Sequence, residues 1–443
     1  MKKVISIVLA ALLVLSCVAL FAACGKETTN EETTAAPVAV EGDTIKIGIF
    51  EPASGDNAAG GKQEVLGIRY AHSLKNTVTI AGKEYNIELV EVDNQTDADK
   101  APSAAQQLVS AGVSVVLGSY GSGASMAGGE YFKEASIPAI GCSCTNPGVT
   151  SENEFYFRVC YLDPFQGTVM ANFAKDEGCT KALVLTQLGD DYSTGLGKFF
   201  ETAAAEIGLE VVANQFAAGT TDYTSYINTA ITEGCDAIFA PTSTTVAALL
   251  IEQCKTAGFT GKVLAGDTWE SSVILDAAKG SDLYVACSTF FDENDESASE
   301  FVTGYKAWLN ADAQNLTNNG GNDIVAAVSA LGYDSYMTAI AALEKAEGTD
   351  GASIKAALES INSADAAVAG VTGAIYFDEI GDAVRDTAYI KSVDTENGAF
   401  VFVKTQSVAA AEEAEETEEA VEETVEETVE ETEEAAEEEV TEA

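Results

Sequence analysis

The chain has 443 residues, of which 47% are hydrophobic, and its formal net charge is −48. A chain of this length can bury at least two sizeable hydrophobic cores, and its hydrophobic fraction is ordinary for a globular protein. Because so acidic a chain would repel phosphates, its charge argues against nucleic-acid binding.

The first residues have the pattern of a secretory signal. Lys2 and Lys3 precede an apolar run over 4–20, which is short for a membrane span, and small residues then lead to Cys24. A cysteine at this break looks like a bacterial lipobox, which predicts a signal peptide over 1–23, cleavage before Cys24 and a lipid on its sulfur. An uncleaved membrane anchor is the alternative, and both place the protein on the outer face of the cytoplasmic membrane. The segment 24–43 begins with Cys24 and is rich in Thr, Glu and Ala, a composition that predicts a flexible tether.

From residue 44 onward, short apolar runs alternate with amphipathic segments. This rhythm predicts a mostly parallel sheet with helices on both faces. The single histidine, His72, shares a helical stripe with Val65 and Ile68, so we expect it to pack. The predicted strands cover 45–50, 85–92, 114–117 and 137–140, and the predicted helices cover 61–75, 100–110 and 122–135.

After Phe157 the rhythm restarts, which predicts a second sheet with its own helices. No Pro/Gly/Ser linker separates the halves, so we expect the chain to pass between the two sheets more than once. Residues 297–347 are expected to be mostly helical, and the span 373–404 is expected to form antiparallel strands that close the domain. The predicted helices cover 165–177, 194–207, 223–233, 245–257 and 271–278, and the predicted strands cover 182–187, 209–216, 237–241, 262–267 and 283–291.

Two turns within 118–147 carry the pattern of an anion site. Each follows the carboxyl end of a predicted strand, where open α/β sheets bind ligands. The first turn also starts a helix, whose free N–H groups and dipole attract an anion, with Ser122 as the expected N-cap. The second turn, CSCTNP, adds the hydroxyl groups of Ser143 and Thr145. Together they predict a seat for a carboxylate, although the same residues also suit a helix cap and ordinary turns.

These turns belong to a larger set of motifs in a fixed order. With them come IKIGIFEPASGDNAAGG, VDNQTD, YFRVCYLDPFQG, DDYSTGLG and AGDTWESS. Over roughly 44–404 the chain resembles the branched-chain amino-acid-type substrate-binding proteins of ABC transporters. The resemblance implies an α/β fold of periplasmic-binding-protein type I, with two doubly wound parallel-sheet lobes joined by a three-segment hinge. It places lobe 1 at 44–162 plus 291–377 and lobe 2 at 163–290 plus 378–404, with crossings near Leu162, Phe290 and Phe377.

The resemblance also implies a ligand site between the lobes. A zwitterionic ligand needs N–H and O–H donors on one side and a carboxylate on the other, and charge-assisted hydrogen bonds select for both charges. Hydroxyl residues of lobe 1 would hold the α-carboxylate, and an acidic residue of lobe 2 would take the α-ammonium. An aromatic residue would fold over the ligand, with two further aromatics as candidates for the wall. The hydroxyl residues are Ser122, Ser143 and Thr145, and the acidic residue is Asp267. The aromatic residue that folds over the ligand is Tyr192, and the two wall candidates are Trp269 and Tyr333.

Two departures from the family concern the ligand side chain. Branched-chain amino-acid binders often carry a tyrosine in the loop after the first strand, where this chain has Ala59-Gly60-Gly61. They often carry another where this chain has Thr242-Ser243-Thr244. We therefore expect a pocket that is larger or more polar than one shaped for leucine. No Arg or Lys stands at the motif positions, which weakens the case for a glutamate or aspartate ligand.

The main hypothesis is a non-catalytic, monomeric lipoprotein that captures an amino acid and presents it to the transmembrane subunits of an ABC permease. The alternatives on the same fold are a ligand-sensing module or a binder of amides, short peptides or aromatic acids. An enzyme is disfavoured because one histidine on a helix stripe offers no Ser-His or Cys-His arrangement and no phosphate-binding loop is present. We expect no cofactor and no catalytic residue. A purely structural surface protein, without ligand-dependent closure, is the remaining alternative.

The cysteines and the acidic C-terminus are the least ordinary features. If Cys17 leaves with the signal and Cys24 is lipidated, seven cysteines remain, an odd number in apolar segments that predicts buried free thiols. Cys142 and Cys144 flank Ser143, but a C-x-C turn supplies only two ligands, so no metal site is expected there. Residues 408–443 contain 18 Glu and no Lys or Arg. This composition predicts an extended, solvating acidic tail over 405–443, with weak cation binding or contact with a basic surface as alternatives.

Overall fold

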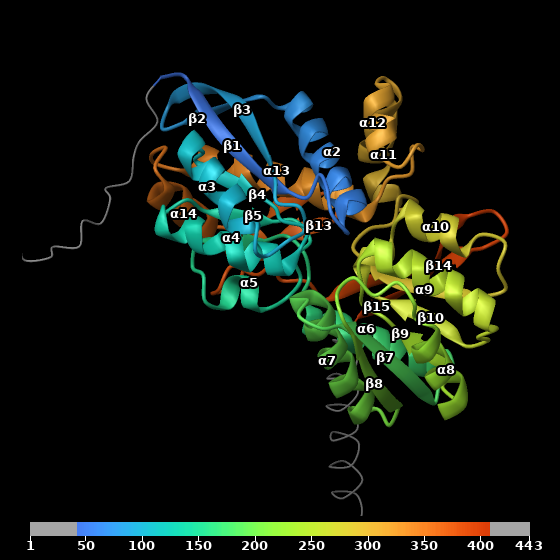
Figure 1. Cartoon of the computed structure of the whole chain (residues 1–443). Helices are drawn as coiled ribbons and strands as arrows, with labels where there is room; N and C mark the ends of the chain where they lie inside the picture. The colour runs from blue at the N-terminus through green and yellow to red at the C-terminus, as the bar shows by residue number, and fades with distance from the viewer. Residues whose placement is uncertain (1–41, 408–443) are drawn as a thin grey trace, which may run out of the picture. The chain divides into compact units, whose positions relative to one another are not determined.

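The structure, a computed structural model, describes residues 42–407 (Figure 1). These residues contain two large sheets, each at the centre of one α/β lobe. The predicted signal peptide, the predicted lipidation site Cys24 and residues 408–443 of the predicted tail lie outside the described residues. Residues 405–407, which were expected to begin that tail, instead end strand β15 (Ala399–Ser407). No helix within 42–407 has the length and hydrophobicity needed to cross a membrane.

The first lobe contains a six-stranded sheet in the order β2-β3-β1-β4-β5-β6. Strands β1 and β3 to β6 run parallel, whereas β2 forms an antiparallel hairpin with β3. The central strands β4 and β5 are buried throughout, as expected of a parallel sheet covered on both faces. The strands are β1 Thr44–Glu51, β2 Thr77–Ile80, β3 Lys83–Asp93, β4 Val115–Leu117, β5 Ala139–Gly141 and β6 Tyr156–Arg158.

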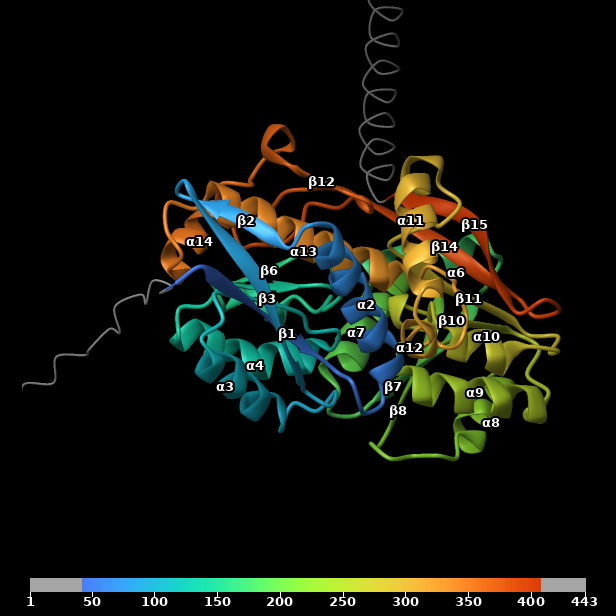
Figure 2. The same cartoon turned by 90° about the horizontal axis from the view of Figure 1, so that it is seen from above.

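Helices cover both faces of this sheet, and some of them come from the C-terminal third of the chain. Figure 2 shows α3 and α4 on one side of the sheet and α13 on the other. Helix α13 packs along α2, which brings residues far apart in sequence into one lobe. The helices are α2 Ala58–Leu74, α3 Ala101–Ala111, α4 Ser122–Glu134, α5 Gly148–Ser151, α11 Ser299–Asn310, α12 Ala313–Asn318, α13 Ala327–Lys345 and α14 Gly351–Glu359.

The second lobe contains a seven-stranded sheet in the order β15-β14-β11-β10-β9-β7-β8. The strands from β7 to β11 pair in parallel, and β14 and β15 add an antiparallel edge. Helix α6 packs on α7, and α9 packs on α8 and α10. The strands are β7 Lys181–Gln187, β8 Glu210–Phe216, β9 Ala237–Phe239, β10 Lys262–Ala265, β11 Tyr284–Thr289, β14 Thr387–Asp394 and β15 Ala399–Ser407, and the helices are α6 Asp163–Asp176, α7 Asp191–Glu206, α8 Thr224–Glu233, α9 Thr244–Ala257 and α10 Ser272–Ala278.

The chain passes between the two lobes three times. It leaves the first sheet after β6, returns to the first lobe after β11, and enters β14 after a small hairpin of β12 (Val368–Gly370) and β13 (Gly373–Ile375). The connecting segments contain Leu162, Phe290 and Phe377, and the rings of Tyr161 and Phe290 lie 4.1 Å apart. That the lobes close about these segments stays a prediction.

The alternation of strands and helices predicted over 44–291 is confirmed, but two short strands, β2 and β6, were not predicted. The strand β2 was missed, because its turn to β3 is Ala81-Gly82 rather than a common Asn-Gly, although both residues have the positive φ of such a hairpin turn (48° and 82°). The antiparallel strands predicted over 373–404 are present, but they belong to two separate sheets. Residues 373–375 pair with β12 in a two-stranded sheet, whereas β14 pairs with β15 at the edge of the second large sheet. Local pattern predicts that a segment is a strand but not which partner it takes.

The predicted packing role of the histidine and the thiols agrees with the structure. The His72 Nε2 atom lies 3.1 Å from the carbonyl oxygen of Ile87, and its ring meets the Tyr336 ring edge-on at 5.9 Å. All seven cysteines within the described residues are buried and free, as predicted.

Candidate functional site

A cleft of about 390 Å³ is lined by residues of both lobes. Among the predicted site residues, Ser122 and Ser143 line it from the first lobe and Tyr192 lines it from the second. Asp267 precedes the lining residue Thr268. The structure therefore brings residues of the carboxylate seat and of the opposite wall into one cleft, because they follow the carboxyl ends of strands in the two sheets.

The carboxylate seat is built differently from the predicted N-cap. Ser122 is the first residue of α4, and the cap position belongs to Gly121, which has extended backbone angles and no side chain to cap the helix. The Ser122 hydroxyl instead accepts a hydrogen bond from the Asn146 backbone N–H at 3.2 Å. This bond ties the β4–α4 turn to the turn after β5. The N–H groups of the first turn of α4 have no carbonyl partner within the helix, so the helix start suits an anion.

Arg158 holds the second turn from beneath. Its Nη1 donates to the carbonyl oxygens of Cys144 (2.8 Å) and Asn146 (2.7 Å), and its Nε donates to Asp382. Its Nη2 donates to the Thr150 hydroxyl at 2.8 Å. Because Arg158 is fully buried and four of its five N–H donors are used by these bonds, it positions the turn.

Behind the seat lie two buried glutamates that the sequence analysis missed. Ser143 Oγ donates to Glu64 Oε1 of α2, and the Tyr120 backbone N–H donates to Glu51 Oε2 at the end of β1 (2.7 Å). Burial raises the pKa of Glu64 to about 7, and burial together with the Glu64 carboxylate raises the pKa of Glu51 well above its usual range. Gly118 approaches Glu51 so closely, with a φ of +107°, that a Cβ atom there would lie 2.3 Å from Glu51 Oε1.

On the opposite wall, Asp267 begins a short 3-10 turn after β10 and is 3% exposed. The Tyr192 hydroxyl of α7 donates to its carboxylate at 3.0 Å. The Asp267 backbone N–H donates to Gln166 Oε1 at 2.7 Å, and that oxygen also accepts from Ser288 Oγ at 2.8 Å. Burial raises the Asp267 pKa to about 6, although the bonds from Gln166 and Tyr192 oppose this shift. The carboxylate is thus held in place, and within residues 42–407 it forms no ion pair with a Lys, Arg or His, whereas the nearby Glu270 pairs with Lys391.

Four of the predicted residues are not among those that line the cleft. Asp267 is one of them, although its carboxylate accepts a hydrogen bond from the lining residue Tyr192. Thr145 is buried beside Asp163 at the start of α6, and burial raises the Asp163 pKa to about 8. Trp269 is fully buried in the apolar core of the second lobe. Tyr333 packs in an aromatic cluster of the first lobe, 5.0 Å from Phe301 between ring centroids. An aromatic residue near a site motif suggested a cleft wall, but apolar packing around these two rings takes them into the cores instead.

Tyr120 supplies the aromatic wall that the sequence analysis did not find. Its ring packs directly on Gly60 of α2, where an added Cβ atom would lie 2.1 Å from Tyr120 Cε2. Tyr120 lines the cleft and clusters with Ala326 and Val328. Gly60 lies in the segment where binders of this family often carry a tyrosine. In this chain the glycine makes room for Tyr120, which comes from another turn. The sequence signal that could have predicted this wall was the presence of a small residue, Gly60, together with an aromatic residue, Tyr120, in the turn 118–122.

The rim of the cleft is acidic, and the two lobes touch across it. Asn146 Nδ2 donates to the Asp191 carbonyl oxygen at 2.9 Å, and the Thr244 hydroxyl donates to that of Asp56 at 3.2 Å. No Lys or Arg is among the residues that line the cleft. The acidic lining residues are Asp97, Asp99, Asp190 and Asp191.

Comparisons with known proteins agree with this architecture. Residues 44–399 match the family described as periplasmic binding protein. A leucine-, isoleucine-, valine-, threonine- and alanine-binding protein from Pseudomonas aeruginosa is 25% identical over 77% of this chain and 87% of its own length. The chain spans just under two thirds of the length of other curated relatives, such as 64% of an amino acid binding protein from the same species, at 26% identity over 53% of this chain.

Solved structures confirm the predicted type I fold with two lobes. A leucine-binding protein from Thermotoga maritima has a TM-score of 0.73 and 30% identity, and the match covers 83% of this chain and 100% of that one. A branched-chain amino acid transporter substrate-binding protein from Streptococcus pneumoniae, solved with isoleucine, has a TM-score of 0.70, 27% identity and coverage of 82% and 99%. A benzoate complex of a solute-binding protein from R. palustris, at 19% identity, a TM-score of 0.70 and coverage of 82% and 96%, shares the fold.

Proposed function

Because the chain belongs to the periplasmic-binding-protein family, we propose that it is an extracytoplasmic substrate-binding protein of an ABC importer. It captures an amino acid, branched-chain or related, in the cleft between its lobes and delivers it to the transmembrane subunits of the permease. It acts as a monomer, held at the membrane by a lipid on Cys24. No residue of the site is assigned a catalytic role.

The observation that carries this proposal is the buried Asp267 carboxylate opposite a helix start. A carboxylate in a dry cleft is costly unless a cation or hydrogen-bond donors compensate it, and an ammonium group supplies both. The start of α4 offers backbone N–H groups and the Ser122 hydroxyl to the α-carboxylate of the same ligand, whereas the Ser143 hydroxyl already donates to Glu64. The Tyr192 hydroxyl, which bonds to Asp267 at 3.0 Å, aligns the acid with the cleft.

Aromatic acids are the second candidate, because benzoate occupies a protein of the same fold. A benzoate carries a carboxylate but no ammonium group, so it would leave Asp267 without a partner. Since no Lys or Arg lines the cleft, a ligand without an ammonium group would also face an uncompensated acidic rim. These two features favour an amino acid over an aromatic acid.

A thermal-shift panel tests the ligand class. The whole chain is purified, freed of carried-over ligand by unfolding and dialysis, and melted with each amino acid, with benzoates, amides and dipeptides. A ligand present at 100 times its dissociation constant stabilises the folded state by about 2.7 kcal/mol, which raises Tm by several degrees. The matched control for each active amino acid is the same carboxylic acid without its amino group, which we expect to give no shift.

Two other results would change the conclusion. If the deaminated acid or a benzoate shifts Tm as much as the amino acid does, the ammonium site is wrong and the aromatic-acid alternative gains support. A sensing role on the same fold is separated by transport: loss of this protein should abolish uptake of the labelled ligand by the host cell, and unchanged uptake would favour a sensor.

A further inference from the structure

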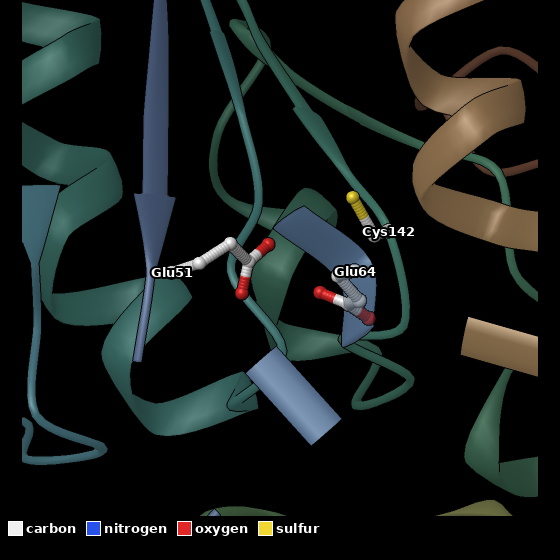
Figure 3. Close-up of side chains that lie close together, drawn as sticks. All are labelled: Glu51, Glu64 and Cys142. Atoms are coloured by element: carbon white, nitrogen blue, oxygen red, sulfur yellow. The ribbon is translucent and has the colours of Figure 1, made fainter. Parts of the chain in front are cut away.

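Glu51, Glu64 and Cys142 converge behind the carboxylate seat from three different elements (Figure 3). Glu51 ends β1, Glu64 lies in α2, and Cys142 follows β5. One donor atom from each lies within 4.8 Å of the others, and all three residues are buried. Residues separated by up to 91 positions therefore bring two oxygens and one sulfur to a single point inside the lobe.

The hydrogen bonds around this cluster leave two carboxylate oxygens without a protein donor. Glu51 Oε2 accepts from the Tyr120 N–H, and Glu64 Oε1 accepts from the Ser143 hydroxyl. Glu51 Oε1 and Glu64 Oε2 are buried and have no hydrogen-bond partner. The Cys142 thiol donates to Ser335 Oγ at 3.3 Å, which leaves the sulfur lone pairs free.

Charge in this cluster is also unbalanced. Neither glutamate forms an ion pair with a Lys, Arg or His within residues 42–407, whereas the buried acids Asp382 and Glu270 each have one. Two carboxylates side by side in a dry interior need a proton or a cation between them. A shared proton would satisfy the two oxygens but gives the adjacent sulfur no role, whereas a metal ion uses all three atoms.

We propose that Glu51, Glu64 and Cys142 bind a divalent transition-metal ion of the Zn²⁺ class. Two carboxylate oxygens and a thiolate form a borderline-soft donor set that suits Zn²⁺ better than Mg²⁺ or Ca²⁺, and three protein ligands leave a fourth coordination position. The thiol and the glutamates lose their protons when the ion binds. This site is distinct from the Asp267 wall, so it does not depend on which ligand the cleft takes.

The ion would fix the floor of the cleft. Glu51 already bonds to the Tyr120 turn and Glu64 to the Ser143 turn, so one ion joins both turns of the seat through their glutamates. The ion therefore has a structural role at this position, and its removal loosens both turns together.

The test uses the whole chain, purified without a histidine tag, unfolded with a chelator and refolded with Co²⁺ or Zn²⁺ in excess Mg²⁺. The excess Mg²⁺ occupies carboxylates elsewhere, including those of the Glu-rich segment after residue 407. Co²⁺ bound to carboxylates alone gives no sulfur-to-cobalt charge-transfer band. We expect one Co²⁺ per chain with this band, and a Tm that rises with Zn²⁺. Cys142→Ser should abolish the band, whereas Cys144→Ser, another buried thiol two residues away, should keep it.

A second variant covers the case in which Cys142→Ser does not fold. Glu51→Gln retains the thiol and should weaken Co²⁺ binding roughly 100-fold or more, since even residues outside the ligand set cost 10–100-fold. The proposal is overturned if the refolded protein takes up no stoichiometric Co²⁺ in excess Mg²⁺. It is also overturned if Cys142→Ser keeps the charge-transfer band, or if Glu51→Gln binds Co²⁺ as tightly as the unaltered chain.

Discussion

Two clusters of buried charge in the first lobe are built in opposite ways. Around Arg158, a guanidinium meets the Asp382 carboxylate, the Thr150 hydroxyl and two backbone carbonyls, with both charged side chains 3% exposed or less. Around Glu51 and Glu64, two acids meet only single donors and no cation among the described residues. One cluster is complete in the protein alone, and the other is not.

The difference separates framework from site. The complete cluster fixes the carbonyls of the turn after β5, so that Ser143 is held in a constant position. The incomplete clusters, which are the glutamate pair and Asp267 across the cleft, lie where a ligand, proton or ion can supply the missing charge. Buried acids with raised pKa values and no paired cation mark functional positions for this reason.

The most direct way to break the complete cluster is Arg158→Met. This change leaves the Asp382 carboxylate buried without its cation, which should lower the free energy of unfolding by about 3–5 kcal/mol. Urea unfolding measures the loss. The matched control is Arg69→Met, whose pair with Glu91 is 37% exposed on each side and should contribute about 0–1 kcal/mol.

A double variant separates the cost of an unpaired buried charge from the cost of altered packing at this cluster. Arg158→Met with Asp382→Leu removes both charges and should recover most of the stability lost in the single variant. If Arg158→Met alone unfolds at the same urea concentration as the unaltered protein, the cluster does not hold the turn and the comparison fails.

At the incomplete cluster of the second lobe, the prediction concerns binding. Asp267→Asn removes the negative charge but keeps the shape, and should weaken amino-acid binding roughly 30-fold or more, or at least about 2 kcal/mol, in isothermal titration. Tyr192→Phe removes only the hydrogen bond to this acid and should cost about 1 kcal/mol. Asp99→Asn, on the acidic rim, is the control and should bind almost normally. Equal affinities for Asp267→Asn and the unaltered protein would place the ammonium group elsewhere.

The incomplete cluster of the first lobe, Glu51 and Glu64, should make the free energy of unfolding depend on pH. Folding raises the pKa of Glu64 from 4.5 to about 7, so between these values the folded state binds more protons than the unfolded state. The free energy of unfolding should therefore fall as pH rises through this window, by about 3 kcal/mol from this group alone.

Urea unfolding of chelator-treated protein at pH 5 and pH 8 measures this dependence. Glu64→Gln, which can still accept the Ser143 hydrogen bond, should lose less stability between the two pH values than the unaltered protein. The exposed Glu88→Gln is the control and should follow the unaltered protein. Identical pH dependence in Glu64→Gln and the unaltered protein would show that Glu64 is not the group whose pKa folding raises.

The sequence predicted the two lobes because parallel strands and amphipathic helices have distinct hydrophobic periods. It also predicted that Ser122 and Ser143 would share a site, since both follow the carboxyl ends of parallel strands, and the family resemblance added Tyr192; all three line one cleft. Pairing between distant segments was less accessible, because the antiparallel strands predicted over 373–404 divide between two separate sheets.

The glutamate pair was beyond the reach of the sequence for a different reason. In a chain with 71 acidic residues, two glutamates thirteen positions apart carry no distinguishing signal. Only the folded structure shows that β1 and α2 bring them together in a dry interior. Trp269 shows the converse error, because its place in the AGDTW motif suggested a cleft wall while its ring packs in the second core.

Substitutions at Gly60 and Tyr120 test how closely the aromatic wall and the glutamate pair are coupled. Gly60→Ala places a methyl group 2.1 Å from Tyr120 Cε2, so the ring must move, at a cost of about 1–3 kcal/mol in the free energy of unfolding. Because the Tyr120 N–H bonds to Glu51, this movement also disturbs the incomplete cluster.

Tyr120→Leu in the same chain removes the clashing ring, so the double variant should be more stable than the sum of the single effects predicts. Leucine at this position also opens the cleft beside Gly60, which should shift the ligand preference toward larger side chains in the thermal-shift panel. Additive effects on stability would mean that Tyr120 does not rest on Gly60. An unchanged ligand preference would mean that the ring is not part of the ligand's wall, and the side-chain pocket would then have to be sought along the Thr242–Thr244 segment.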